Sequence, residues 1–126
     1  MNHFGELLRL EHLETPEGVA VIEVDIRQEL CNRYGSVHGG VLTTLMDVAG
    51  LWAGAKPKSL PRASTVSLAC SFMAPAMLAE TPRLRARAEI VKRGRSMYFC
   101  SILVTSIREG AVLAMGQGAF RWISAP

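Results

Sequence analysis

The chain has 126 residues, which suits a single domain covering residues 1–126 and is short enough for self-association to add useful stability. Its net charge of +3 comes from scattered basic residues, the densest group being Lys92-Arg93-Gly94-Arg95, so we expect no nucleic-acid partner. The N-terminus lacks the basic and apolar regions of a signal peptide, and no apolar run reaches the roughly 18 residues of a membrane span.

The first forty residues predict a β-hairpin followed by irregular chain. Residues 7–13 have a broken, strand-like pattern, and residues 14–18 contain Pro16 and Gly18, which favour a turn. Residues 19–26 alternate in polarity and are rich in β-branched side chains, as in a strand. Residues 27–40 hold several glycines and predict an irregular segment that leads into a helix.

One long helix and four more strands complete the predicted order. Residues 41–55 are rich in Leu, Met and Ala and end before Pro57, which predicts a helix. Residues 65–72, 83–90 and 97–104 alternate with a period of two, and residues 112–123 form a further apolar strand. The order β-β-α-β-β-β-β predicts an α+β fold, in which a long antiparallel sheet curls around the single helix.

The predicted helix has one unusual face. The large apolar side chains gather on one side, which we expect to pack on the sheet; they are Leu42, Leu45, Met46, Val48, Ala49, Trp52 and Ala53. The other side carries small residues and one acid: Gly40, Thr43, Thr44, Asp47, Gly50 and Gly54. Because glycine destabilises a helix by about 1 kcal/mol relative to alanine, we expect another helix or a narrow ligand to approach Gly50 and Gly54 closely.

Asp47 is the candidate catalytic group on this face. Aspartate is a poor helix former and, in the middle of a helix, cannot cap its end. Two plainer interpretations remain open at this point: a solvent-facing side chain, or a structural acid bonded to a distant arginine.

The segment before the helix supplies candidate donors for an oxyanion. Gly39 and Gly40 stand where the first helical N–H groups have no acceptor inside the helix, and the helix dipole adds partial positive charge there. His38 and Asn32 add side-chain donors nearby. A flexible helix start with a capping histidine would give the same residues, so His-Gly-Gly alone is a weak signal.

Cysteine and histidine usage indicates a reducing compartment. Cys31, Cys70 and Cys100 are widely spaced and odd in number, which favours free thiols in a cytoplasmic protein. No histidine has a partner at metal-ligand spacing, so we expect no bound metal.

Taken together, Asn32-x-x-Gly35-x-x-His38-Gly39-Gly40 followed by Asp47 resembles the signature of hotdog-fold acyl-CoA thioesterases of the PaaI-like, phenylacetate-pathway type. The resemblance extends over residues 19–120. It implies a central helix wrapped by a curved sheet. It also implies a homodimer, and by family habit a homotetramer, with an acyl-CoA site at the subunit interface.

The resemblance also implies residue roles. The Gly39 N–H would polarise the thioester carbonyl with Asn32 close by, and His38 would help to position the substrate. Asp47 of the opposite subunit would act as general base or as nucleophile. Thr65 matches the hydroxyl that steadies the attacking water, Ser64 competes with it, and an ordinary strand threonine is an equal alternative.

Substrate contacts and cofactors follow from the same resemblance. Gly40 and several basic residues are candidates for binding coenzyme A; the basic ones are Lys92, Arg93, Arg95 and Arg62, with Lys56 and Lys58. Coenzyme A is part of the substrate, and no other cofactor is needed. Residues that could line the acyl pocket or belong to the core are Met46, Leu51, Trp52, Phe72 and Met73.

Three other functions remain possible from the sequence, one of which is a structural domain whose glycines serve only dimer packing. A non-catalytic acyl-CoA sensor would keep the pocket without needing the acid. A hotdog enoyl-CoA hydratase is less favoured, because such enzymes place Asp and His together in a loop, whereas Asp47 follows His38 by nine residues.

Overall fold

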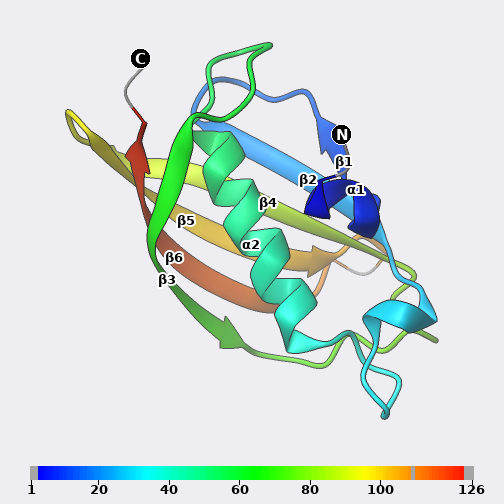
Figure 1. The fold of residues 1–126 in the computed structure, drawn as a ribbon. Helices are drawn as coiled ribbons and strands as arrows, with labels where there is room; N and C mark the ends of the chain where they lie inside the picture. The colour runs from blue at the N-terminus through cyan, green and yellow to red at the C-terminus, as the bar shows by residue number, and fades with distance from the viewer. Residues whose placement is uncertain (1–2, 109, 124–126) are drawn as a thin grey trace.

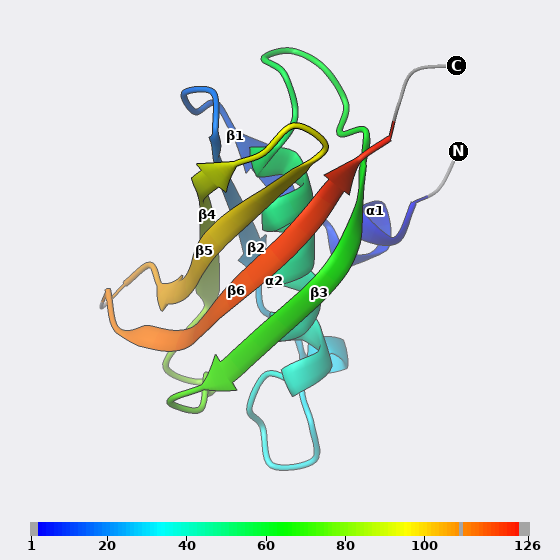
Figure 2. The same cartoon turned by 90° about the vertical axis from the view of Figure 1, so that its left-hand side faces the viewer.

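A curved antiparallel sheet wraps around one long helix in the computed structural model, which describes residues 3–108 and 110–123 (Figures 1 and 2). Helix α2 spans Gly39–Ala53. The six strands are β1 Glu11–Leu13, β2 Val19–Asp25, β3 Ala63–Phe72, β4 Arg83–Arg93, β5 Met97–Ser106 and β6 Val112–Trp122. Their spatial order is β1-β2-β4-β5-β6-β3, with antiparallel neighbours throughout. The helix and the sequence order of the strands are therefore as predicted, and β3 lies at the edge far from β1.

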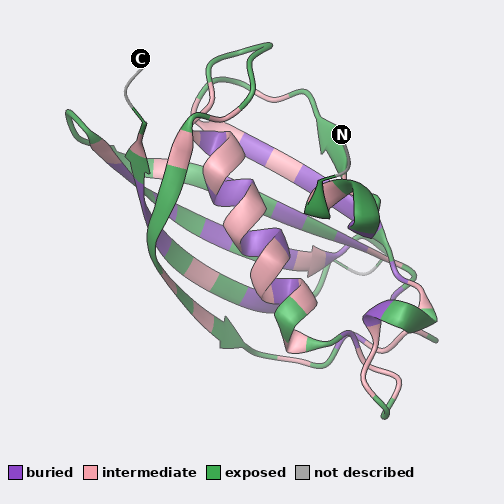
Figure 3. Cartoon of the chain, viewed as in Figure 1, coloured by how far each residue is buried: buried purple, intermediate pink, exposed green. Residues whose placement is uncertain are grey.

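The core lies between α2 and the concave face of the sheet, where buried and exposed residues alternate along the strands (Figure 3). Leu42, Leu45, Met46, Ala49 and Ala53 of α2 are all nearly inaccessible to solvent. This is the apolar face that the helical periodicity predicts. At roughly 25 cal/mol per Å² of buried apolar surface, its burial is the main force that holds the helix in the sheet.

The expectation about the helix glycines is wrong. A Cβ atom added at Gly50 would collide with the Phe120 ring, and one added at Gly54 would collide with the Tyr98 ring. Tyr98 also donates a hydrogen bond of 3.0 Å from its hydroxyl to the Gly50 carbonyl. Both glycines therefore admit large aromatic rings from the chain's own sheet, not a second helix or a ligand.

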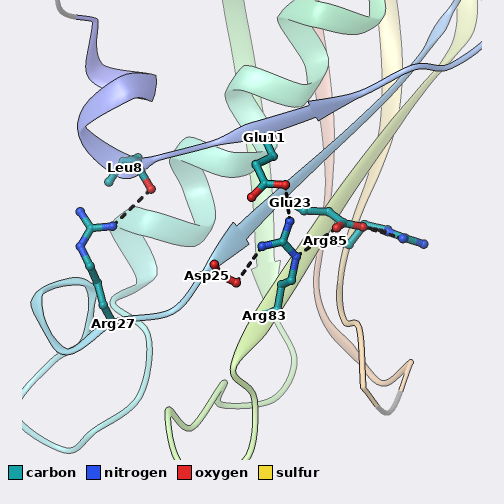
Figure 4. Close-up of polar contacts among 7 residues, drawn as sticks. All are labelled: Leu8, Glu11, Glu23, Asp25, Arg27, Arg83 and Arg85. Carbon is teal, nitrogen blue, oxygen red and sulfur yellow. Dashed lines mark hydrogen bonds and ion pairs between the residues drawn. The ribbon is translucent and has the colours of Figure 1, made fainter.

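The N-terminal segment also differs from its prediction. Residues 7 and 8 belong to a short helix, α1 (Phe4–Leu8), and only residues 11–13 form the strand β1. The Arg27 guanidinium donates hydrogen bonds to the carbonyls of Leu7 and Leu8 at the end of α1 (Figure 4 draws the second). This contact between segments about twenty residues apart satisfies the free carbonyls of the helix end, and no local pattern encodes it. A short 3-10 helix, Gln28–Leu30, follows β2.

A cluster of charged side chains fastens β1 to its neighbours. Arg83 on β4 contacts Glu11 on β1 at 2.7 Å, Asp25 on β2 at 2.7 Å and Glu23 on β2 at 3.1 Å (Figure 4). Arg85 adds a second hydrogen bond to Glu23, at 2.7 Å. Glu23 is buried, and its contacts with two arginines satisfy both carboxylate oxygens.

Candidate functional site

Asp47 is the acidic side chain that the middle of α2 presents to β3. It is half-buried, and its Oδ1 accepts a hydrogen bond of 2.5 Å from the Thr65 hydroxyl on β3. The competing candidate Ser64 pairs with Arg121 in the β3–β6 ladder and lies one residue away from this contact. The structure thus brings Asp47 and Thr65 together, and a structural bond from Asp47 to a distant arginine is not observed among the described residues.

A β-bulge explains why Thr65 faces the helix. Thr65 is opposite Phe120 and Ser67 is opposite Ala119, so Val66 is an extra residue on β3. Regular alternation would place Thr65 on the face opposite to Leu68. The extra residue shifts the alternation, and Thr65 comes to the inner face, which it shares with Leu68. Bulges commonly re-aim a side chain in this way next to functional sites.

Two further polar side chains, which sequence reasoning did not select as site residues, surround Asp47. Thr43 lies one helical turn before it, and its hydroxyl bonds to the Gly39 carbonyl at 3.0 Å. Cys70 on β3 contacts Thr43; burial raises the pKa of the Cys70 thiol, and the Asp47 charge raises it further, while the Thr43 contact lowers it. The helical spacing of Thr43 and Asp47 was visible in the sequence, whereas the approach of Cys70 depended on the strand register.

The start of α2 has one occupied and one free amide. His38 caps the helix, and its Nδ1 accepts a hydrogen bond of 2.8 Å from the Gly40 N–H. A Cβ atom at Gly40 would lie only 3.0 Å from that nitrogen, so glycine suits the cap. The Gly39 N–H has no acceptor within the part of the chain that the structure describes. Of the two candidate oxyanion donors, Gly39 therefore has a free N–H, whereas the Gly40 N–H is engaged by His38.

Asn32 and Gly35 shape the loop that leads to this amide. The Asn32 Oδ1 accepts hydrogen bonds from the amides of Tyr34 and Ser36, and its Nδ2 donates one of 2.8 Å to the Ser36 hydroxyl. Gly35 has a φ of +83°, which glycine adopts without strain. The side chain of Asn32 thus bonds within its own loop, and its closeness to a substrate stays a prediction.

Gly39 and Asp47 are separated along one helix. They are eight residues apart in the sequence, which corresponds to about 12 Å along the helix axis. An oxyanion donor lies about 3 Å from its oxygen, and a reacting group lies about 3–3.5 Å from the carbonyl carbon. Even with helix side chains leaning toward the N-terminus, one thioester carbonyl does not reach both groups of a single chain.

The candidate basic residues come from two segments that meet at the end of β6. The Trp122 N–H donates to the Ser96 carbonyl of the β4–β5 turn, and the Ile123 N–H donates to the Arg62 carbonyl. A second bulge, between Ile90 and Lys92, leaves Lys92 opposite Phe99 and Arg93 opposite Tyr98. Arg93 lies over the Trp122 ring at 5.3 Å, as in a cation–π contact. Arg95 and Arg62 are exposed, on the β4–β5 turn and before β3 respectively.

The candidate acyl-pocket residues differ in how far they are buried. Met46 is fully buried in the core, and Leu51 is half-buried against it. Phe72 and Met73 are more than half exposed, and the Phe72 ring comes within 3.7 Å of the Cβ position of Gly39. Phe72 is therefore the apolar side chain that stands beside the free amide.

Neither a metal cluster nor a membrane helix is found in the described ranges. No group of three or more His, Cys, Asp or Glu side chains within residues 3–108 and 110–123 is placed to hold a metal ion. Likewise, none of the helices in that part of the chain has the length and apolar character needed to cross a bilayer.

Comparison with known proteins identifies the family of this chain. Residues 34–112, more than half of the chain, match the family model described as the thioesterase superfamily, and this range includes His38, Gly39, Asp47 and Thr65. Human acyl-coenzyme A thioesterase 13 is 27% identical over 100 residues, which are 79% of this chain and 70% of the human protein.

Solved structures agree with the fold. The E. coli PaaI protein of the phenylacetic acid degradation operon superposes with a TM-score of 0.82 at 20% identity, covering 96% of this chain and 84% of PaaI. A protein from Thermus thermophilus superposes with a TM-score of 0.83 at 28% identity, covering 98% of this chain and 100% of that protein. The predicted hotdog fold is confirmed.

Proposed function

The chain belongs to the thioesterase superfamily, and we propose on this premise that it hydrolyses the thioester of an acyl- or arylacyl-coenzyme A to the free acid and coenzyme A. The residue assignment rests on the hydrogen bond from the Thr65 hydroxyl to Asp47 of α2. The first amide of the same helix, that of Gly39, is free. A free amide and an oriented carboxylate are the two groups that thioester hydrolysis requires.

A second copy of the chain completes the proposed site. Because Gly39 and Asp47 of one helix are about 12 Å apart, the Asp47 side chain that serves one Gly39 amide comes from a partner protomer. The strand β3 offers a surface for that partner: it is an edge of the sheet, it is ten residues long, and it contains neither a charged residue nor a proline. Pairing of two β3 edges would bring two α2 helices side by side in a homodimer, and dimers would associate into a tetramer.

The proposed chemistry uses few groups. The Gly39 N–H donates to the thioester carbonyl oxygen and stabilises the negative charge that develops there. As general base, Asp47 takes a proton from water while the water oxygen adds to the carbonyl carbon. The C–S bond then breaks, and the coenzyme A sulfur takes the proton from Asp47. As nucleophile, Asp47 would instead displace the thiolate and form an anhydride, which water hydrolyses.

The remaining assignments follow from this reaction. The thioester needs no metal or redox group for hydrolysis, and coenzyme A enters as part of the substrate. Arg62, Lys92, Arg93 and Arg95 remain candidates for its phosphates, with Gly40 and His38 near the reacting end. The described cysteines are free thiols, which supports a cytoplasmic location.

Replacing Asp47 by Asn tests the proposal directly, with release of free thiol from a panel of acyl- and arylacyl-CoA esters as the assay. We expect kcat to fall by at least about a thousandfold, because the amide neither accepts the water proton nor attacks the carbon. The oligomer and the melting temperature should stay close to those of the wild type. Thiol release by the Asp47→Asn variant at the wild-type rate would refute the role of Asp47.

Two outcomes of the same panel would replace the proposed activity. Binding of acyl-CoA without thiol release from any ester would identify a sensor. Loss of the conjugated absorbance of an enoyl-CoA without release of coenzyme A would identify a hydratase. Label found in the Asp47 carboxylate after a single turnover in ¹⁸O-labelled water would establish the nucleophile role, because the general-base route never bonds Asp47 to the water oxygen.

A further inference from the structure

A cavity of about 560 Å³ lies at the C-terminal end of α2, on the flank away from Asp47. One wall is the turn between β1 and β2, and the other is the loop of residues 55–60 that follows α2; Figures 1 and 2 show both segments at this end of the helix. Trp52 of α2 lines the cavity. It follows Asp47 by five residues, which is about 140° around the helix axis at 100° per residue. Asp47 faces β3, whereas Trp52 faces β1, so the cavity is separate from the Asp47–Thr65 pair.

The floor of the cavity is aromatic. The His12 ring on β1 lies against the Trp52 indole, with ring centroids 4.1 Å apart and planes inclined by 38°. Desolvation beside the indole lowers the pKa of His12, so its ring is neutral at neutral pH. Leu13, Val19 and Val21 add apolar surface. A flat ring would find here a large, uncharged contact area of the kind that binds aromatic groups.

The two walls of the cavity carry opposite charges. Lys56 and Lys58 stand in the loop after the helix, while Glu14 and Glu17 stand in the facing turn. An anionic group is attracted to the lysine wall and repelled by the glutamate wall, so the cavity favours a ligand with its negative charge at one end. The volume lies within the range of about 300–1,000 Å³ that is typical of small-molecule sites.

The backbone of Lys58 adds an independent indication. Lys58 has a φ of +59°, one of two positive values at non-glycine residues in the described chain. A left-handed backbone at a lysine costs free energy, and such conformations cluster at ligand-binding sites. The turn that holds it is closed by a hydrogen bond of 3.0 Å from the Ser59 N–H to the Lys56 carbonyl. The strained backbone thus belongs to the lysine wall.

We propose that this cavity binds a planar aromatic ring that bears an anionic group, with the ring on Trp52 and His12 and the anion at Lys56 and Lys58. Two sources carry this chemistry: an aromatic carboxylic acid, such as hydrolysis of an arylacyl thioester would release, and the adenine nucleotide end of coenzyme A. The first would make the cavity a product-sensing site, and the second would make it a substrate anchor.

Isothermal titration calorimetry on the full chain at neutral pH tests the proposal with three probes: 6-hydroxy-2-naphthoate, adenosine 3′,5′-bisphosphate and octanoate. At least one aromatic anion should bind with a submillimolar Kd, and octanoate at least about tenfold more weakly, because it lacks a ring. The aromatic probe that binds identifies the source. Absence of binding by both aromatic probes, or equal binding of octanoate, would overturn the proposal.

Matched variants place the binding in this cavity. The double variant Lys56→Gln/Lys58→Gln should weaken aromatic anion binding about tenfold, and Trp52→Leu should weaken it about fivefold. Arg108→Gln/Arg121→Gln removes two exposed positive charges elsewhere and should leave the Kd unchanged. A wild-type Kd for the lysine variant would refute the site. The readout is binding, not turnover, so its failure leaves the proposed hydrolysis standing, and an inactive enzyme leaves this test intact.

Discussion

The two edge strands of the sheet differ in length and in charge. At one edge, β1 is three residues long and is fastened by Glu11 to the arginine cluster around Arg83. At the other edge, β3 is ten residues long, carries only small polar and apolar side chains, and has no strand on its outer side in the described residues. Proteins commonly shorten or charge the sheet edges that must not pair with another chain. The β1 edge follows this practice, whereas the β3 edge does not. The open edge is also the one that holds Thr65, so the proposed dimer edge coincides with the proposed catalytic pair.

The largest effect is expected when a charge is placed on the β3 edge, which then resembles the β1 edge. Val66 is the bulged residue of β3 and is 48% exposed, and Leu13 of β1 is 39% exposed. The Val66→Asp variant would place a charge on each β3 edge, and charged edge residues oppose pairing with another chain. We expect it to elute from size-exclusion chromatography with light scattering as a monomer of 13.7 kDa, with wild-type circular dichroism and no turnover. The matched variant Leu13→Asp should remain oligomeric. A monomeric wild-type protein that is active would contradict the two-chain site.

A smaller effect is expected at Thr65, the residue that joins the open edge to the helix. Thr65→Val keeps the shape and removes the hydroxyl that orients Asp47. A hydrogen bond to a charged group contributes about 1.5–3 kcal/mol, so kcat should fall about tenfold to a hundredfold. KM and the oligomeric state should change little, because Thr65 positions Asp47 and does not hold the substrate. Thr65→Ser, which restores the hydroxyl, should recover most of the activity. A rise in KM with an unchanged kcat in Thr65→Val would point to a role in substrate binding instead.

The bulge at Val66 also shows what the sequence could predict. Period-two alternation correctly predicted that residues 65–72 form a strand, and helical periodicity correctly placed Leu42, Leu45 and Met46 on the sheet. The alternation did not reveal the extra residue on β3, because a bulge depends on the register with β6. The direction of Thr65 therefore became known only from the structure. Register depends on two paired strands, whereas a local sequence pattern describes only one strand.

The glycines of α2 also show which contacts the local sequence predicts and which it does not. The sequence predicts accessible amides at Gly39 and Gly40, and the structure finds the Gly39 amide free and the Gly40 amide bound by His38. The sequence also predicts a partner surface at Gly50 and Gly54, and the structure instead places Phe120 and Tyr98 against them. Local chemistry predicts the free Gly39 amide because helix ends have a fixed hydrogen-bond deficit, whereas the Gly40 amide is occupied because of how the His38 side chain is oriented. The second pair depends on rings contributed from 44 or more positions away along the chain.

The smallest expected effect concerns the charged cluster beside β1 and the way its contribution to stability depends on pH. Burial of Glu23 favours its neutral form, but the hydrogen bonds and charges of Arg85 and Arg83 outweigh this and lower its pKa below the usual value of 4.5. A lowered folded-state pKa means that the charged carboxylate stabilises the fold above the unfolded-state pKa, and that this stability is lost as the pH falls through the folded-state value. Urea unfolding should therefore show Glu23→Gln to be about 1–2 kcal/mol less stable than the wild type at pH 7, with the difference shrinking as the pH is lowered from 7 to 3. Glu89→Gln removes a carboxylate from the exposed pair with Arg87 and should cost less than about 0.5 kcal/mol at either pH. A constant difference for Glu23→Gln from pH 7 to pH 3 would mean that shape, not charge, accounts for the contribution of Glu23 to the contact between β2 and β4.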